Sequence, residues 1–103
     1  EQFIIVECIK LASYYKSEYR FSYLMTEAEA EVDLVIERPG KKLLLIEIKS
    51  TDSVRKEDLT SLVRIANDLG ECETVCFSCD PRKRKIDNVT VYPWEEGVKE
   101  FFS

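Results

Sequence analysis

The spacing of hydrophobic and polar residues changes several times along the chain, and each change marks a predicted element. Residues 1–17 carry Ile, Val, Leu and Tyr at helical spacing, which predicts a helix with a wide buried face. Three stretches rich in β-branched, aromatic and aliphatic residues follow, and they predict strands over 20–25, 31–37 and 42–49. The sequence Arg38-Pro39-Gly40-Lys41 is a strong turn signal, so we expect the second and third strands to form a hairpin.

The second half of the chain returns to helical spacing before it alternates again. Residues 54–69 predict a helix that Ser53 or Asp52 caps and Gly70 ends. A fully apolar strand over 74–78, a basic loop over 80–88, a strand over 89–92 and a helix over Trp94–Phe102 complete the pattern. The order α-β-β-β-α-β-β-α predicts an α/β sandwich whose sheet is mixed, because the helix over 54–69 permits a parallel crossover.

The length and the apolar runs indicate one domain over residues 1–103. No apolar run approaches the roughly 20 residues that cross a bilayer, and no signal peptide is visible, so we expect a cytoplasmic protein without a membrane partner. The chain has no initiator Met and opens inside a predicted helix, which suggests a fragment of a longer protein.

Composition narrows the possible chemistry. A formal net charge of −5 argues against binding nucleic acid through bulk electrostatics, although a carboxylate site counts as negative until it binds its cation. The chain contains no His, which excludes His-dependent triads and His-ligated metal sites. Any metal site must therefore use oxygen or sulfur ligands.

Four cysteines leave two interpretations open. Cys72, Cys76 and Cys79 are closely spaced and Cys8 lies far upstream, a pattern that an iron–sulfur cluster could use. We favour reduced, structural cysteines, because Cys76 falls within a predicted buried strand and period-2 geometry turns Cys76 and Cys79 to opposite faces.

The strongest candidate site lies in the predicted hairpin. Asp33 interrupts one apolar strand, and Glu47 and Lys49 interrupt the next. Burying such groups is costly unless they pair or hold a metal. A three- or five-residue loop would place Asp33 opposite Glu47 on one face, whereas a two- or four-residue loop would turn the carboxylates to opposite faces. The functional interpretation requires the odd loop.

Two carboxylates on neighbouring strands are suited to Mg²⁺ or Mn²⁺. The ammonium of Lys49 could orient or help deprotonate an attacking water and stabilise negative charge on a phosphate, as metal-assisted phosphodiester cleavage requires. A third acid from the first helix, Glu1 or Glu7, could complete the set of ligands.

The spacing D-x13-E-x-K at Asp33, Glu47 and Lys49 resembles the core motif of the PD-(D/E)XK nuclease superfamily. The sequence around these residues, with A-E-V-D-L-V-I-E and L-I-E-I-K-S, is similar to that of a C-terminal domain found on prokaryotic AAA-type ATPases. In that domain the Glu of the first helix corresponds to Glu1. The resemblance implies a restriction-endonuclease-like sandwich, metal ligation by Asp33, Glu47 and Glu1, and DNA as the substrate. It also implies an ATPase domain of the same parent chain as a partner.

The basic run Arg82, Lys83, Arg84 and Lys85 offers candidate contacts to a nucleic-acid backbone, and a solvated loop is the alternative. A second function also stays open, in which the domain is a regulatory or partner-binding module of the ATPase that catalyses nothing itself. The net negative charge and the single short basic run favour this alternative.

Overall fold

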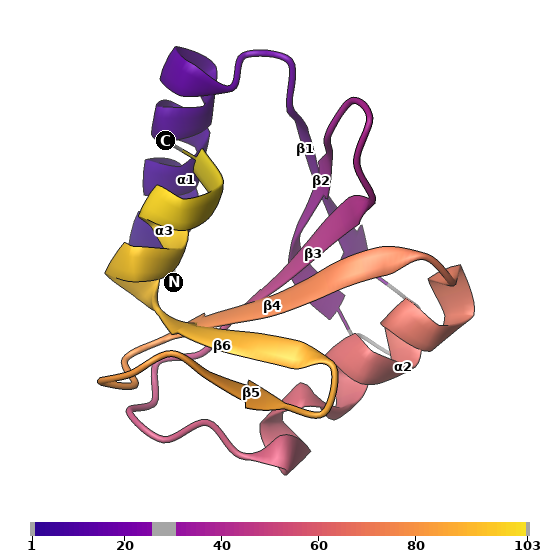
Figure 1. The fold of residues 1–103 in the computed structure, drawn as a ribbon, viewed down its shortest axis with the longest axis vertical. Helices are drawn as coiled ribbons and strands as arrows, with labels where there is room; N and C mark the ends of the chain where they lie inside the picture. Colours follow the sequence, from indigo (N-terminus) through magenta and orange to yellow (C-terminus); the bar gives the residue numbers. More distant parts are fainter. Residues whose placement is uncertain (1, 26–30, 103) are drawn as a thin grey trace.

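The computed structural model describes residues 2–25 and 31–102, and within them the chain forms a mixed α/β fold. Three helices flank one twisted sheet of six strands (Figure 1). The elements, in chain order, are α1 (Gln2–Tyr15), β1 (Arg20–Met25), β2 (Glu31–Glu37), β3 (Leu43–Ile48), the 3-10 turn η1 (Lys56–Leu59), α2 (Thr60–Leu69), β4 (Cys72–Ser78), β5 (Arg84–Ile86), β6 (Val89–Pro93) and α3 (Trp94–Phe102).

The sheet has the strand order β1-β2-β3-β4-β6-β5. Strands β1, β2 and β3 form an antiparallel meander, and β3, β4 and β6 run parallel. Strand β5 pairs antiparallel with β6 at the far edge. The predicted mixed sheet and the parallel crossover through the second helix are therefore confirmed.

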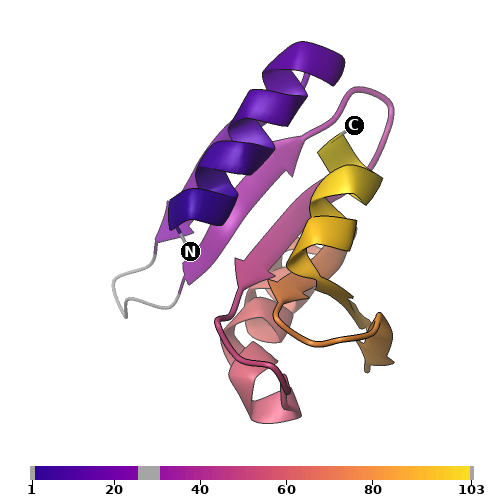
Figure 2. The same cartoon turned by 90° about the vertical axis from the view of Figure 1, so that its left-hand side faces the viewer.

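Helices α1 and α3 lie side by side on one face of the sheet, and α2 covers the other (Figure 2). Each face has its own apolar core. Beneath α1 and α3 the core includes Cys8, Ile46 and Phe77, whereas beneath α2 it includes Leu45 and Cys76. Neighbouring residues of β3 thus point to opposite cores, as period-2 geometry requires.

Two local expectations were wrong. The helix predicted over 54–69 becomes regular only at Thr60, after η1, and neither Ser53 nor Asp52 caps it. The amide of Val54 instead donates to the carboxylate of Asp80, which holds the start of this segment against the end of β4. The loop predicted over 80–88 contains the short strand β5.

Among the residues described, no helix has the length and apolar character needed to cross a membrane.

Candidate functional site

Strand β2 carries an irregularity at the first candidate carboxylate. Ser22 of β1 pairs with Val35, whereas Leu24 pairs with Val32, so one residue of β1 faces both Asp33 and Leu34. A bulge of this kind inserts an extra residue into one strand and re-aims its side chain. The bulge therefore allows Asp33 to leave the regular alternation of β2.

The Asp33 carboxylate reaches the neighbouring strand β3. Its Oδ2 accepts a hydrogen bond of 2.7 Å from the backbone N–H of Ile48. Ile48 lies between the other two candidates, Glu47 and Lys49. This contact places the Asp33 carboxylate against the backbone of β3, at the residue between Glu47 and Lys49.

The register of the hairpin agrees with the odd loop that the functional interpretation needs. Leu34 pairs with Ile46 and Ile36 with Leu44, which leaves Pro39, Gly40 and Lys41 as the loop. The Lys41 amide donates to the Arg38 carbonyl across this turn at 3.1 Å. Of the two odd loop lengths left open, the hairpin has the three-residue one.

Glu47 lies near the end of β3 and Lys49 directly follows the strand, but the two side chains differ in exposure. The side chain of Glu47 is 12% exposed and that of Lys49 is 34% exposed, and Lys49 Nζ lies 3.5 Å from Glu47 Oε2. The Lys49 amide also donates to the Phe77 carbonyl, which fixes the backbone of Lys49 against β4. A mostly buried carboxylate thus faces an ammonium that solvent can reach.

Cys76 lies next to Glu47 on the face of the sheet that α2 covers. It pairs with Glu47 across β3 and β4 and is fully buried in the core beneath α2. Burial and, to a smaller extent, the negative charge of Glu47 raise the pKa of the Cys76 thiol to about 12. The positive charge of Lys49 lowers this pKa, and the negative charges of Asp80 and Asp33 raise it.

The third metal ligand is not supplied by the described residues. Glu1, the predicted ligand from the first helix, lies outside them. Glu7 pairs with Lys10 at 3.6 Å on α1, which covers the opposite face of the sheet from Glu47. Among residues 2–25 and 31–102, no group of three or more Cys, Asp and Glu side chains is arranged to hold a metal ion.

The basic run does not form one cationic surface. Lys83 Nζ lies over the Tyr92 ring at 5.1 Å from its centroid, whereas Arg84 pairs with Asp80 at 3.1 Å on the opposite side of β5. Arg82 and Lys85 are exposed. Of the four, only Arg84 and Lys85 belong to β5, and the alternation of the strand turns these two side chains to opposite faces of the sheet.

Sequence reasoning missed Asp80, although it is one of the most buried charged residues described, with 5% exposure. Burial raises the pKa of its carboxyl, but hydrogen bonds from Ser78, Val54 and Arg84 outweigh that effect and lower the pKa below the usual value. An acid two residues after a buried strand, with Arg four residues later, was the available signal.

The four cysteines are free. Cys8 points from α1 into the core beneath α1 and α3, and Cys76 lies in the core beneath α2, so these two thiols lie on opposite faces of the sheet. Cys79 is exposed. This separation favours the structural interpretation over a shared cluster.

The sequence was compared with known protein families, curated proteins and solved structures. A family model described as "Domain of unknown function (DUF4143)" matches residues 1–96. The chain belongs to the DUF4143 family. No curated protein and no solved structure matches this DUF4143 domain. The description assigns no chemistry to the family, so the geometry of the DUF4143 domain must support any functional proposal.

Proposed function

We propose that this domain is a metal-dependent nuclease of the PD-(D/E)XK type, with a restriction-endonuclease-like fold, that hydrolyses phosphodiester bonds of DNA. The observation that carries the proposal is the hydrogen bond from Ile48 to Asp33, because it joins the strand of Asp33 to β3, which contains Glu47 and is followed directly by Lys49. The order of helices and strands and the spacing D-x13-E-x-K agree with this assignment.

The donor set fits Mg²⁺ or Mn²⁺. Asp33 and Glu47 offer carboxylate oxygens, which these cations prefer, and Mg²⁺ commonly keeps several waters when it binds one or two carboxylates. A bound cation would supply Lewis acidity and lower the pKa of a coordinated water. Glu1 stays a predicted third ligand.

Lys49 has a separate task in this proposal. Its ammonium is partly exposed and lies 3.5 Å from Glu47 Oε2. From this position it would orient the attacking water and stabilise the negative charge that develops on the phosphate. The ion pair with Glu47 holds the ammonium at the end of β3 in the absence of substrate.

The first experiment measures Mn²⁺ binding by titration calorimetry. Wild type should bind the cation, and Asp33→Asn and Glu47→Gln should each abolish binding while the fold, followed by circular dichroism, is retained. Unchanged Mn²⁺ affinity in both variants would contradict the proposed metal site.

The second experiment tests turnover on single-stranded DNA, double-stranded DNA and RNA, with Mg²⁺ or Mn²⁺ present. Lys49→Ala should lose cleavage. Lys10→Ala is the matched control, because Lys10 also pairs with a Glu, at 3.6 Å, but on the opposite face of the sheet. Equal cleavage by wild type and Lys49→Ala would exclude the assigned role of Lys49.

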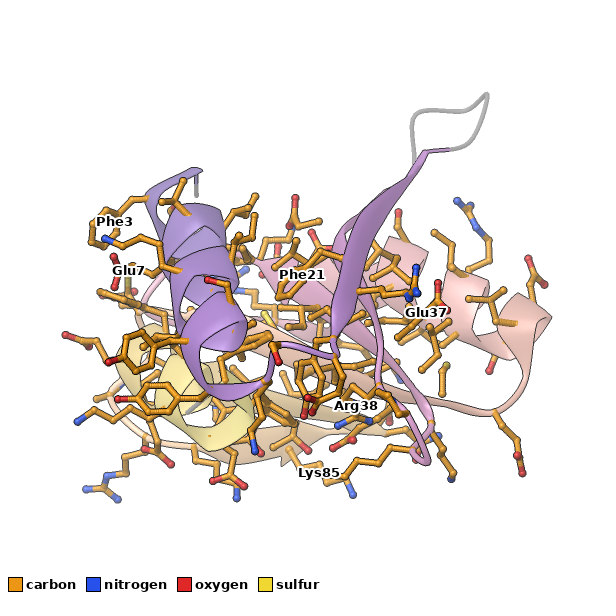
Figure 3. All side chains as sticks on the ribbon, turned by 90° about the horizontal axis from the view of Figure 1, so that it is seen from above. Phe3, Glu7, Phe21, Glu37, Arg38 and Lys85 are labelled. Carbon is orange, nitrogen blue, oxygen red and sulfur yellow. The ribbon has the colours of Figure 1, made fainter. Side chains whose placement is uncertain are left out.

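A second candidate function is a regulatory or partner-binding module of an AAA-type ATPase that catalyses nothing itself. The outer surface of α1 favours it, because Phe3 is 63% exposed and Val6, Ile9, Tyr14 and Tyr15 are also exposed. Phe3 and Glu7 point outward from α1 (Figure 3). This alternative predicts no cleavage of any nucleic acid with either cation.

A further inference from the structure

Asp80 is held by a network of hydrogen bonds at the end of β4. Ser78 Oγ donates to Asp80 Oδ2 at 2.6 Å, and the Asp80 amide donates back to Ser78 Oγ at 3.0 Å. The same Oδ2 accepts the backbone N–H of Val54 at 3.2 Å. A buried carboxylate thus connects the end of β4 to a loop that is 26 residues away in sequence.

Arg84 of β5 completes the network from the other side. Its Nε and Nη2 each lie 3.1 Å from Asp80 Oδ1, and its Nη2 also donates to the Val54 carbonyl. Both polar backbone groups of Val54 are therefore held, the N–H by Asp80 and the carbonyl by Arg84. We name these two side chains, Asp80 and Arg84, the Val54 clamp.

The clamped loop begins directly after the candidate site. Lys49 leaves β3, residues 50–55 cross beside β5, and the chain then enters η1 and α2 (Figure 1). A further bond from the Cys79 amide to the Thr51 carbonyl, at 2.9 Å, fixes the same loop to the end of β4. Strands β3 and β4 are parallel neighbours, so Lys49, which follows β3, and Asp80, which follows β4, lie at the same end of the sheet.

We propose that Asp80 and Arg84 are positioning residues that hold the loop over residues 50–55 and thereby fix Lys49 at the candidate site. Arg84 then acts through the clamp and not as a contact to the nucleic-acid backbone. The positioning role rests on the proposed nuclease function, whereas the clamp itself does not. A displacement of about 1 Å in a catalytic group can cost about a hundredfold in rate, so loosening this loop should lower turnover.

Arg84→Lys separates the two roles of Arg84. Lys keeps the positive charge that a phosphate contact needs, but it loses the planar fork that spans Asp80 and the Val54 carbonyl. The matched control is Arg38→Lys. Arg38 also joins a carboxylate to a backbone carbonyl, with Glu73 at 2.9 Å and the Lys42 carbonyl at 2.8 Å, but it does so beside the β2–β3 turn.

Hydrogen exchange of the amides in residues 50–55 is the first measurement, and it needs no activity. Arg84→Lys should raise the exchange rate of this loop at least about tenfold relative to the rest of the chain. Arg38→Lys should leave the loop at the wild-type rate. Unchanged loop exchange in Arg84→Lys, or an equal increase in both variants, would overturn the clamp.

Steady-state cleavage of DNA is the second measurement. Arg84→Lys should lower kcat about tenfold or more with an unchanged KM, whereas Arg38→Lys should keep both constants. A raised KM with an unchanged kcat would overturn the positioning role, because it is the result expected of a substrate contact. A wild type that cleaves nothing would overturn the proposed function and the positioning role together, while loop exchange would still decide whether the clamp exists.

Discussion

The hydrogen bond between Asp33 and Ile48 predicts that two substitutions at Asp33 will differ in stability. Asp33→Ala removes the carboxylate that accepts the Ile48 amide proton at this bulge, where the ladder between β2 and β3 ends. A hydrogen bond to a charged group contributes about 1.5–3 kcal/mol, and a buried donor left without an acceptor costs a similar amount. We expect the free energy of unfolding of Asp33→Ala to fall by about 2 kcal/mol.

Asp33→Asn keeps an oxygen in nearly the same place. The amide oxygen can accept the Ile48 N–H, but the bond loses its charge assistance, which is about half of its strength. The expected loss is therefore about 1 kcal/mol or less. Both variants should nevertheless lose Mn²⁺ affinity, because both lack the carboxylate.

Urea unfolding of the metal-free protein, followed by circular dichroism, measures this difference. With a slope of about 1–3 kcal/mol per molar urea, a gap of about 1 kcal/mol separates the two midpoints by several tenths of a molar. Equal stability of Asp33→Ala and Asp33→Asn would refute the reasoning. It would mean that the bulge keeps its shape without the bond to Ile48.

Three further predictions concern the packing, the thiols and acid stability. Gly97→Ala should destabilise the domain by about 1 kcal/mol in urea unfolding, because the new Cβ would lie 2.4 Å from Phe77 Cε1. This overpacking outweighs the gain in helix propensity. A variant more stable than wild type would contradict the packing. At pH 8, iodoacetamide should modify the exposed Cys79 and spare Cys76, because burial raises the pKa of the Cys76 thiol to about 12. Mass spectrometry measures the labelling, and equal modification of the two thiols would contradict this prediction. Burial alone would raise the pKa of Asp80, but its hydrogen bonds lower it, so its stabilising effect is present above the unfolded pKa and is lost as pH falls through the folded pKa. The stability difference between wild type and Asp80→Asn should accordingly shrink as the pH of the unfolding experiment falls below about 4, and a constant difference would exclude this linkage.

The hairpin was predictable because its information is local. The residues Pro39 and Gly40 specify a tight connection, and Gly40 adopts a φ of 75°, which Gly accepts without strain. The apolar alternation on either side then fixes the register, since a slip of one residue would expose a buried face. For the same reason Asp33, Glu47 and Lys49 stood out as charges within apolar strands.

The bulge at Asp33 had no comparable signal. Its evidence is a shift in pairing with β1, and that shift depends on how two strands align rather than on the composition of either strand. Period-2 reasoning assumes an unbroken ladder, so it could place Asp33 on a face but could not predict that its carboxylate would bond to Ile48.

The Val54 clamp was out of reach for a related reason. Asp80 and Arg84 contact Val54 across 26 and 30 residues of sequence, and the segment around Val54 has helix-forming residues that favoured a different local structure. Tertiary hydrogen bonds overrode that preference and delayed the regular helix to Thr60. A charge within an apolar strand, such as Glu47, stands out in the sequence, whereas a charge in a loop, such as Asp80, is recognised as buried only from the fold. The candidate chemistry of this domain therefore follows from local pattern, and the geometry on which that chemistry depends follows from contacts between distant segments.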